Sequence, residues 1–279
     1  MEVRLITLSE NTAHTIDLLA EWGLSILIEA DNLRILFDTG PSISAAHNAD
    51  VLGQDLATVD KIVLSHGHFD HTGGLRQVLC KMRKEVEVIA HPDVWAPKYG
   101  GSRAMNIYRY VGVPFQKDEL EARGGRFVLD KGPVWLTDSV VATGEITMVT
   151  EYEQIDARLF VKQGDDFAPD PVLDDRAIII KSDQGLIVIA GCAHRGIVNT
   201  ILYAQDLTAE KRIHAVVGGI HLHNASEEQQ EKTIAAFREL GVERIGVSHC
   251  TGLPAAARLA QEFGDSFFFN NAGTVVSFP

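Results

Sequence analysis

The sequence Ser65-His66-Gly67-His68-Phe69-Asp70-His71-Thr72-Gly73-Gly74 directly follows the apolar run 61–64, which predicts a short strand. Four side chains between positions 66 and 71 are metal ligands by type, because imidazole nitrogens and carboxylate oxygens bind divalent cations. The chance distribution of 11 histidines does not account for so dense a cluster. These ligands alone do not close a metal site, and open coordination positions are typical of catalytic metals. The stretch therefore predicts a metalloenzyme.

Three further histidines follow strand-like runs elsewhere in the chain: His194, His221 and His249. Loops at strand ends gather at one edge of a sheet, so we expect these side chains to converge with the first cluster. Asp70 and His221 are the candidate catalytic residues, since His221 could bind a substrate phosphate or act as an acid or base. Arg195 is a candidate to bind substrate. The remaining histidines are expected to be ordinary core or surface residues: His14, His47, His91, His214 and His223.

The pattern His-x-His-x-Asp-His after a strand resembles the signature of the metallo-β-lactamase fold superfamily. The resemblance implies a ligand set for each of two divalent metal ions: His66, His68 and His194 for the first, and Asp70, His71 and His249 for the second. It also implies that a water or hydroxide lies between them. Two ions about 3.5–4 Å apart can acidify a water molecule and stabilise a displacement reaction. Zn²⁺ is the expected metal, with Mn²⁺ or iron as alternatives.

Two further positions are interpreted through this resemblance. The superfamily pattern carries a Gly-Asp pair whose carboxylate bridges the metals, and this chain has Gly191-Cys192 at the corresponding place. Cys192 could supply a bridging thiolate, which would favour zinc, or it could be a small buried hydrophobic side chain. Asp38 ends another strand-like run and resembles a superfamily aspartate that supports the metal ligands by hydrogen bonding.

A narrower resemblance extends over almost the whole chain. Its motifs are Gly23-Leu24-Ser25, Phe37-Asp38-Thr39-Gly40, 64–68, Thr143-Gly144-Glu145-Ile146, Asp174-Asp175-Arg176-Ala177, 191–200, 218–222 and His249-Cys250-Thr251-Gly252. They resemble the subfamily named for 7,8-dihydropterin-6-methyl-4-(β-D-ribofuranosyl)aminobenzene 5′-phosphate synthase. This resemblance implies a condensation of an activated pterin with a phosphorylated ribosyl-aminobenzene that releases pyrophosphate. Trp22 departs from the pattern, in which a histidine commonly precedes Gly-Leu-Ser, so the role of that histidine does not carry over.

The chain of 279 residues is 46% hydrophobic and has a formal net charge of −13. This composition predicts one domain over residues 1–279. The aromatic and basic region 92–132 is either a cap over the site, where such side chains suit a planar or phosphorylated ligand, or an ordinary helical insertion with its aromatic side chains in a small core of its own. The charge disfavours nucleic acid as a partner, and the lack of an 18-residue apolar run disfavours a membrane. The expected partner is a small-molecule substrate, phosphorylated or pterin-like, and a homo-oligomer is compatible with the sequence. Three cysteines without a Cys-x-x-Cys pair favour a reducing compartment, the cytoplasm.

Short apolar or alternating runs predict strands, and amphipathic segments between them predict helices. Strands are expected at 3–8, 24–29, 33–37, 61–64, 86–90, 126–129, 134–136, 158–161, 177–180, 186–190, 215–217, 244–247 and, with a turn inside, 267–277. Helices are expected at 74–83, 197–204, 226–240 and 255–263, and turns at 30–32, 182–185 and 270–273 predict hairpins. The fold class is therefore α/β, a four-layer αβ/βα sandwich with two mixed sheets and helices outside, which is the superfamily architecture.

Several functions fit the predicted centre. The first is a dinuclear metal-dependent hydrolase of a small phosphorylated or phosphodiester-type substrate, with a metal-bound hydroxide as nucleophile. The second is the condensation implied by the narrower resemblance, which needs the same ligands. An iron-dependent redox enzyme ranks lower because the nearby thiols and the missing bridging carboxylate favour zinc. A non-catalytic metal-dependent sensor would also keep these ligands.

Overall fold

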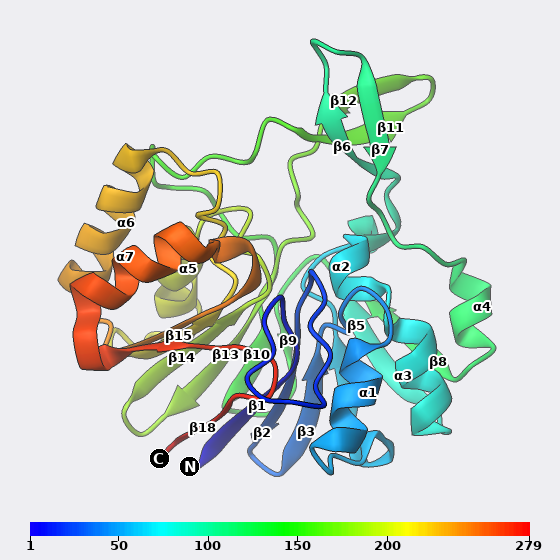
Figure 1. The fold of residues 1–279 in the computed structure, drawn as a ribbon, viewed down its shortest axis with the longest axis horizontal. Helices are drawn as coiled ribbons and strands as arrows, with labels where there is room; N and C mark the ends of the chain where they lie inside the picture. Colours follow the sequence, from blue (N-terminus) through cyan, green and yellow to red (C-terminus); the bar gives the residue numbers. More distant parts are fainter.

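Two seven-stranded sheets pack against each other at the centre of the computed structural model, which describes residues 1–279 (Figure 1). The first sheet has, in order, β18 (Val275–Phe278), β1 (Val3–Ser9), β2 (Ser25–Ala30), β3 (Leu33–Phe37), β4 (Lys61–Val63), β5 (Val86–Ala90) and β8 (Gly125–Leu129). The second has β17 (Phe267–Phe269), β16 (Arg244–Val247), β15 (Ile213–Gly218), β14 (Gly185–Ala190), β13 (Ala177–Ser182), β10 (Val140–Ala142) and β9 (Val134–Trp135). Both sheets are mixed, since each contains parallel and antiparallel pairs.

Both faces of the central strands are buried, which explains their nearly continuous apolar sequences. Every residue of β14 is buried, for example. One apolar cluster fills the space between the two sheets and includes Ile26 and Ile28 of β2 together with Ile178 and Ile187 of the second sheet. Each sheet also has one apolar cluster between its outer face and the helices that cover it. The structure therefore confirms the predicted α/β sandwich.

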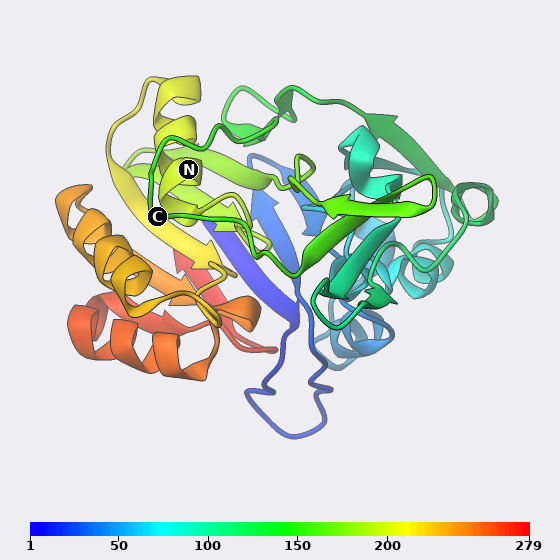
Figure 2. The same cartoon turned by 90° about the horizontal axis from the view of Figure 1, so that it is seen from above.

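The helices cover the two outer faces (Figures 1 and 2). The first sheet is covered by α1 (Ser44–Val51), α3 (Leu75–Met82) and α4 (Lys117–Glu121), and the second by α5 (Ile197–Thr208), α6 (Glu227–Glu239) and α7 (Leu253–Phe263). A four-residue helix, α2 (Phe69–Thr72), lies inside the histidine-rich stretch. Ser226 caps the start of α6, because its side chain accepts a hydrogen bond from the Gln229 amide at 3.1 Å.

A third, four-stranded sheet stands apart from the sandwich, at the top of Figure 1. It has the order β12 (Asp166–Pro169), β11 (Leu159–Gln163), β6 (Lys98–Ser102) and β7 (Ile107–Tyr110). The region 92–132 thus contributes two strands to this sheet, while its later part forms α4 and β8 against the first sheet. Strands β6, β7 and β12 were not expected, because short runs that mix Gly, aromatic and charged residues carry no clear period of two. The three-residue apolar strand β10 was not expected either.

The expected hairpin at 270–273 is wrong. Strand β17 pairs in parallel with β16 in the second sheet, whereas β18 pairs antiparallel with β1 in the first sheet. The intervening Asn270 is buried and accepts a hydrogen bond from the Thr7 hydroxyl at 2.8 Å. A turn-forming sequence does not reveal whether the chain folds back on its own sheet or crosses to another. The hairpins β2–β3 and β13–β14 are confirmed.

None of the helices combines the length and the hydrophobicity that crossing a membrane requires.

Candidate metal centre

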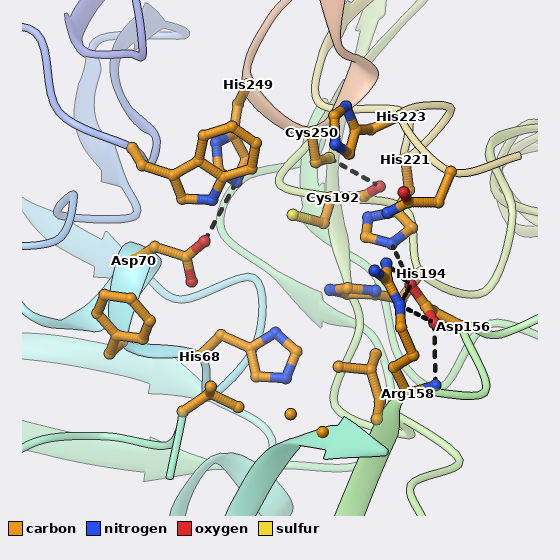
Figure 3. A pocket seen from close by; sticks show the side chains of 17 residues that line it. His68, Asp70, Asp156, Arg158, Cys192, His194, His221, His223, His249 and Cys250 are labelled. Carbon is orange, nitrogen blue, oxygen red and sulfur yellow. Dashed lines mark hydrogen bonds and ion pairs between the residues drawn. The ribbon is translucent and has the colours of Figure 1, made fainter. Parts of the chain in front are cut away.

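The candidate ligands lie on loops that follow β4, β14, β15 and β16, at one edge of the paired sheets. Figure 3 shows the side chains of His68, Asp70, Cys192, His194 and His249 around one cavity. Segments more than a hundred residues apart in sequence therefore supply one site. Glycine permits the close approach of these loops: a Cβ atom on Gly191 would lie 2.2 Å from the Ser65 hydroxyl oxygen.

The first group consists of His66, His68 and His194, which are all buried. The Nε2 atom of His66 lies 2.9 Å from Nδ1 of His68 and 3.2 Å from Nε2 of His194. The other ring nitrogens of His68 and His194 are buried without a hydrogen-bond partner. Nitrogen atoms of His68 and His194 thus both approach the Nε2 atom of His66 within 3.2 Å.

The second group consists of Asp70, His71 and His249. The Nε2 atom of His249 lies 3.4 Å from Oδ2 of Asp70, as drawn in Figure 3. The Sγ atom of Cys192 lies 3.2 Å from Nε2 of His71. Cys192 is within 4.8 Å of ligand atoms in both groups, with His66 and His194 on one side and His71 and His249 on the other. Its thiol therefore occupies the space between the two groups.

Neighbouring residues fix the orientation of several imidazoles. The Nδ1 atom of His71 lies 2.7 Å from the Asp38 carboxylate, and that of His66 lies 2.8 Å from the Ser65 hydroxyl oxygen. Ser65 in turn donates to Asp38 at 2.6 Å. If each Nδ1–H donates to these oxygens, the Nε2 lone pairs face the centre, which is the tautomer that metal binding requires.

Asn11 orients His249 in the same way. Its side-chain oxygen lies 3.0 Å from Nδ1 of His249, and the neighbouring Glu10 carboxylate accepts the His249 backbone N–H at 2.7 Å. The backbone at His249 has a positive φ of 52°, and Asp38 and His221 have 58° and 47°. Such backbone conformations are strained for residues other than glycine and cluster at functional sites.

Burial controls the charge of the first group. It lowers the pKa values of His66 and His194 well below the usual value, with the neighbouring imidazoles adding to the effect. Burial also lowers the pKa of His68 to about 3. These rings are therefore neutral over the physiological pH range, as metal-binding imidazoles must be.

The second group is more strongly charged. Burial opposes ionisation of Asp70, but the neighbouring His71 and His249 hold its pKa below the usual value. Burial likewise disfavours the charged form of His71, but the Asp38 and Asp70 carboxylates raise its pKa to about 9. A cation bound here would replace the proton on His71.

The donor sets fit two divalent metal ions. His66, His68 and His194 would hold one, and Asp70, His71 and His249 the other, with Cys192 between them. The fit rests on buried imidazole nitrogens that face one another 2.9–3.2 Å apart, because neutral imidazole lone pairs gathered in this way can bind one cation together. Imidazole with carboxylate suits Zn²⁺, Mn²⁺ and iron, and a thiolate would add preference for zinc.

A cavity of about 430 Å³ opens beside both groups. His221 lines it, 3.9 Å from the Asp156 carboxylate, and Arg158 lines it and pairs with the same carboxylate. Burial opposes protonation of His221, but Asp156 and Cys250 raise its pKa to about 10. His223 also lines the cavity.

Arg195 does not reach this cavity. Its guanidinium donates hydrogen bonds to the backbone carbonyls of Ile146 and Pro171, both at 2.6 Å. Its own backbone amide donates to Asp175 at 2.8 Å. The side chain therefore ties loops together, and Arg158 is the arginine beside the candidate ligands.

A buried ion cluster supports the loop between the first two ligands. The Lys98 ammonium lies 2.9 Å from the Asp170 carboxylate and 2.8 Å from that of Asp174, and all three residues are buried. The other oxygen of Asp174 accepts the Gly67 amide at 2.7 Å. Lys98 belongs to β6, so this cluster connects the third sheet to the loop that carries His66 and His68.

The family model described as the metallo-beta-lactamase superfamily matches residues 23–206. The chain belongs to this superfamily. A relative named 7,8-dihydropterin-6-methyl-4-(beta-D-ribofuranosyl)-aminobenzene-5′-phosphate synthase, from Methanocaldococcus jannaschii, is 31% identical over 99% of this chain and 97% of its own length. A second protein of that organism, uncharacterized, is 32% identical over 96% of this chain and 98% of its own length.

The solved structures include that of Tm1679, described as a metal-dependent hydrolase of the β-lactamase superfamily. It superposes with a TM-score of 0.84 and 30% sequence identity, covering 98% of each chain. The superfamily and the resemblance to the synthase-named subfamily, both expected from the motifs, are therefore confirmed.

Sequence reasoning missed several residues that shape the metallo-β-lactamase site. Glu10 and Asn11 directly follow β1, and polar residues just after a buried strand are a signal that would have found them. Asp156 and Arg158 lie in an irregular segment before β11, and no local pattern marks them. Lys98 is a lone lysine in a weak strand, so its burial was not foreseeable from sequence.

Proposed function

We propose that this protein is a dinuclear metal-dependent hydrolase of a small phosphorylated or phosphodiester-type substrate. The observation that carries the proposal is the pair of ligand groups, His66, His68 and His194 beside Asp70, His71 and His249, four of whose members line a cavity of about 430 Å³: His68, Asp70, His194 and His249. That volume suits a small molecule, and cavities of this kind with convergent polar groups are the usual sites of catalysis. Bound metal ions would supply Lewis acidity and an acidified water.

The residues of the chain have distinct roles in this proposal. His221 is the candidate proton donor to the leaving-group oxygen, because its imidazole faces the cavity and Asp156 lies 3.9 Å from Nε2. Arg158 is the candidate to bind a phosphate oxygen with its guanidinium. Trp22 and Phe69 line the cavity and would exclude water from part of it.

The first test is elemental analysis of the purified protein together with turnover of phosphomonoesters and phosphodiesters. Two zinc or manganese ions per chain with phosphodiester turnover support the proposal. The His68→Ala variant is expected to lose metal and turnover but to keep the circular dichroism of the wild type, because His68 lies on a loop outside the apolar core. Full metal content and activity in that variant would refute the ligand assignment, and stoichiometric iron without hydrolysis would favour redox chemistry.

A synthase of the kind named for the M. jannaschii relative is the second candidate. It is favoured by the 31% identity that extends over 99% of this chain. In that reaction the same ligand groups would hold the departing pyrophosphate, and no water would attack. Two metal ions without hydrolysis of any phosphoester, together with pyrophosphate release from an activated pterin and a phosphorylated ribosyl-aminobenzene, would establish the synthase and exclude the hydrolase.

A further inference from the structure

Cys192 also belongs to a third set of donor side chains, together with His221 and Cys250. The ligand atoms of these three residues all lie within 4.8 Å of one another. All three residues line the cavity of the metal centre, and Figure 3 labels them there. In a tetrahedral zinc site the sulfur and nitrogen ligands lie roughly 3.5–3.8 Å apart. Small side-chain rotations would therefore bring all three donor atoms onto one cation.

The backbone brings these side chains together from three adjacent strands. Cys192, His221 and Cys250 follow β14, β15 and β16, which are parallel neighbours in the second sheet. The carboxyl ends of parallel strands meet at one edge of a sheet, where ligands commonly bind. A Cβ atom on Gly219 would lie 2.2 Å from the Gly191 carbonyl oxygen and 2.7 Å from Sγ of Cys250. Glycine at position 219 therefore permits the close approach of the three loops.

His221 lacks the hydrogen bonds that a buried imidazole normally makes. Both of its ring nitrogens are buried, and neither has a hydrogen-bond partner. The Nε2 atom lies 3.9 Å from Oδ2 of Asp156, and that carboxylate is held by Arg158, whose Nε atom lies 2.9 Å from Oδ1. A buried polar atom without a partner is destabilising, and a bound ion is one of the partners that can complete it.

The chemistry of the three donors favours a thiophilic cation. Both thiols are buried, and Sγ of Cys250 lies 3.6 Å from the Cys192 carbonyl oxygen, a weak hydrogen bond that a metal ion would replace. Thiolate and imidazole ligands together suit Zn²⁺ and the softer Cd²⁺, whereas Mg²⁺ and Ca²⁺ prefer oxygen. A divalent ion would release both thiol protons on binding. The two thiolates would then balance its charge, so the ion would add no net positive charge beside the two ligand groups.

We propose that Cys192, His221 and Cys250 bind one further thiophilic metal ion, and we name these three residues the thiol site. A sulfur atom has enough lone pairs to contact two ions, so Cys192 can belong to this site and still lie between the two ligand groups. An ion at the thiol site takes a lone pair of His221, which then cannot hold the proton for the leaving group. Occupancy therefore inhibits turnover. The inhibition rests on the proposed function, whereas binding of the ion does not.

The test is titration of the metal-free protein with Cd²⁺ under reducing conditions, followed by elemental analysis after removal of free metal. In excess Cd²⁺ we expect three ions per chain in the wild type. The ultraviolet sulfur-to-cadmium absorption should rise further as the third ion binds, because Cys250 then becomes a ligand. The Cys250→Ser variant should bind the third ion about 10-fold or more weakly, because it removes one of three donors.

Two variants complete the comparison. His221→Ala keeps both thiols but removes the imidazole, so it should also lose the third ion. Cys80→Ser is the matched control, because it changes an exposed thiol outside the cavity and should keep three ions. Circular dichroism of each variant shows whether the fold is retained. For turnover, excess Zn²⁺ should inhibit the wild type and Cys80→Ser but not Cys250→Ser, each compared with its own rate at two equivalents.

The outcomes distinguish the thiol site from the hydrolase. Three ions in the wild type and two in both Cys250→Ser and His221→Ala, without turnover of any phosphoester, would support the thiol site and refute the hydrolase. Two ions in the wild type at excess Cd²⁺, or three ions in every variant, would overturn the thiol site and leave the hydrolase intact. Three ions with undiminished turnover would overturn the inhibition, since His221 would then be free to act with the site occupied.

Discussion

The Oδ2 atom of Asp38 lies 2.7 Å from Nδ1 of His71 and 2.6 Å from the hydroxyl oxygen of Ser65. Ser65 in turn contacts His66 at 2.8 Å. One buried carboxylate from the end of β3 therefore orients an imidazole in each ligand group, directly for His71 and through a hydroxyl for His66. Partners of this type raise the basicity of the imidazole and hold its ring in place.

Replacement of Asp38 by asparagine should weaken metal binding without unfolding the protein. Asparagine keeps the shape of the side chain but removes the charge that holds the Nδ1 proton of His71. Loss of such a partner typically lowers metal affinity about 10- to 100-fold. Competition with a chelator measures the change, and Asp50→Asn, an exposed aspartate, is the control. Wild-type affinity in Asp38→Asn would contradict this role.

Cys192→Ser tests whether the thiol binds metal. Because its Sγ atom lies between the two ligand groups, we expect the variant to bind the second metal ion more weakly. In protein loaded with Co²⁺, a sulfur-to-metal charge-transfer band should be present in the wild type and lost in the variant. Cys80→Ser, which changes an exposed thiol, should keep the band. Identical spectra and stoichiometry would leave Cys192 as a packing residue.

Lys98→Met should destabilise the protein strongly, because it leaves the Asp170 and Asp174 carboxylates buried without their cation. Breaking a buried ion pair in this way typically costs about 3–5 kcal/mol. Lys211→Met removes an exposed pair and should cost less than about 1 kcal/mol. Urea unfolding of both variants gives the two values, and equal losses would show that the cluster contributes no more than a surface pair.

Asp175 should make stability depend on pH. Burial raises its pKa to about 7, although the Arg195 amide opposes the shift. The folded state then binds a proton between the ordinary aspartate pKa and about 7 that the unfolded state releases, so stability falls as pH rises through this window. Urea midpoints from pH 4 to 8 should fall for the wild type more than for Asp175→Asn. Parallel curves would show that Asp175 does not carry the proton.

Much of the fold was predictable because the strands are apolar on both faces and short turns separate them. The apolar runs at β3, β5 and β16 predicted the first and last residues of these strands, and the helix expected from Ser226 onward is α6. The crossing of the chain from β17 in the second sheet to β18 in the first was not predictable. The buried Asn270 side chain between these strands accepts a hydrogen bond from Thr7, which is far away in sequence.

The candidate site was predictable to the extent that its ligands are rare residue types at strand ends. His66, His68, His194 and His249 are brought together as expected, since each follows a strand of one sandwich edge. Their supporting partners could not be read in the same way. Asn11 and Lys98 act through contacts across elements, and such residue types occur on any surface.

Each of the two ligand groups takes members from both halves of the chain. His66 and His68 follow β4 of the first sheet, whereas His194 follows β14 of the second; Asp70 and His71 likewise face His249, which follows β16. Neither sheet therefore has a complete donor set by itself. The second group needs His249, so a growing chain could complete it only after β16 has formed, and binding of a metal ion there would be coupled to the docking of the two sheets.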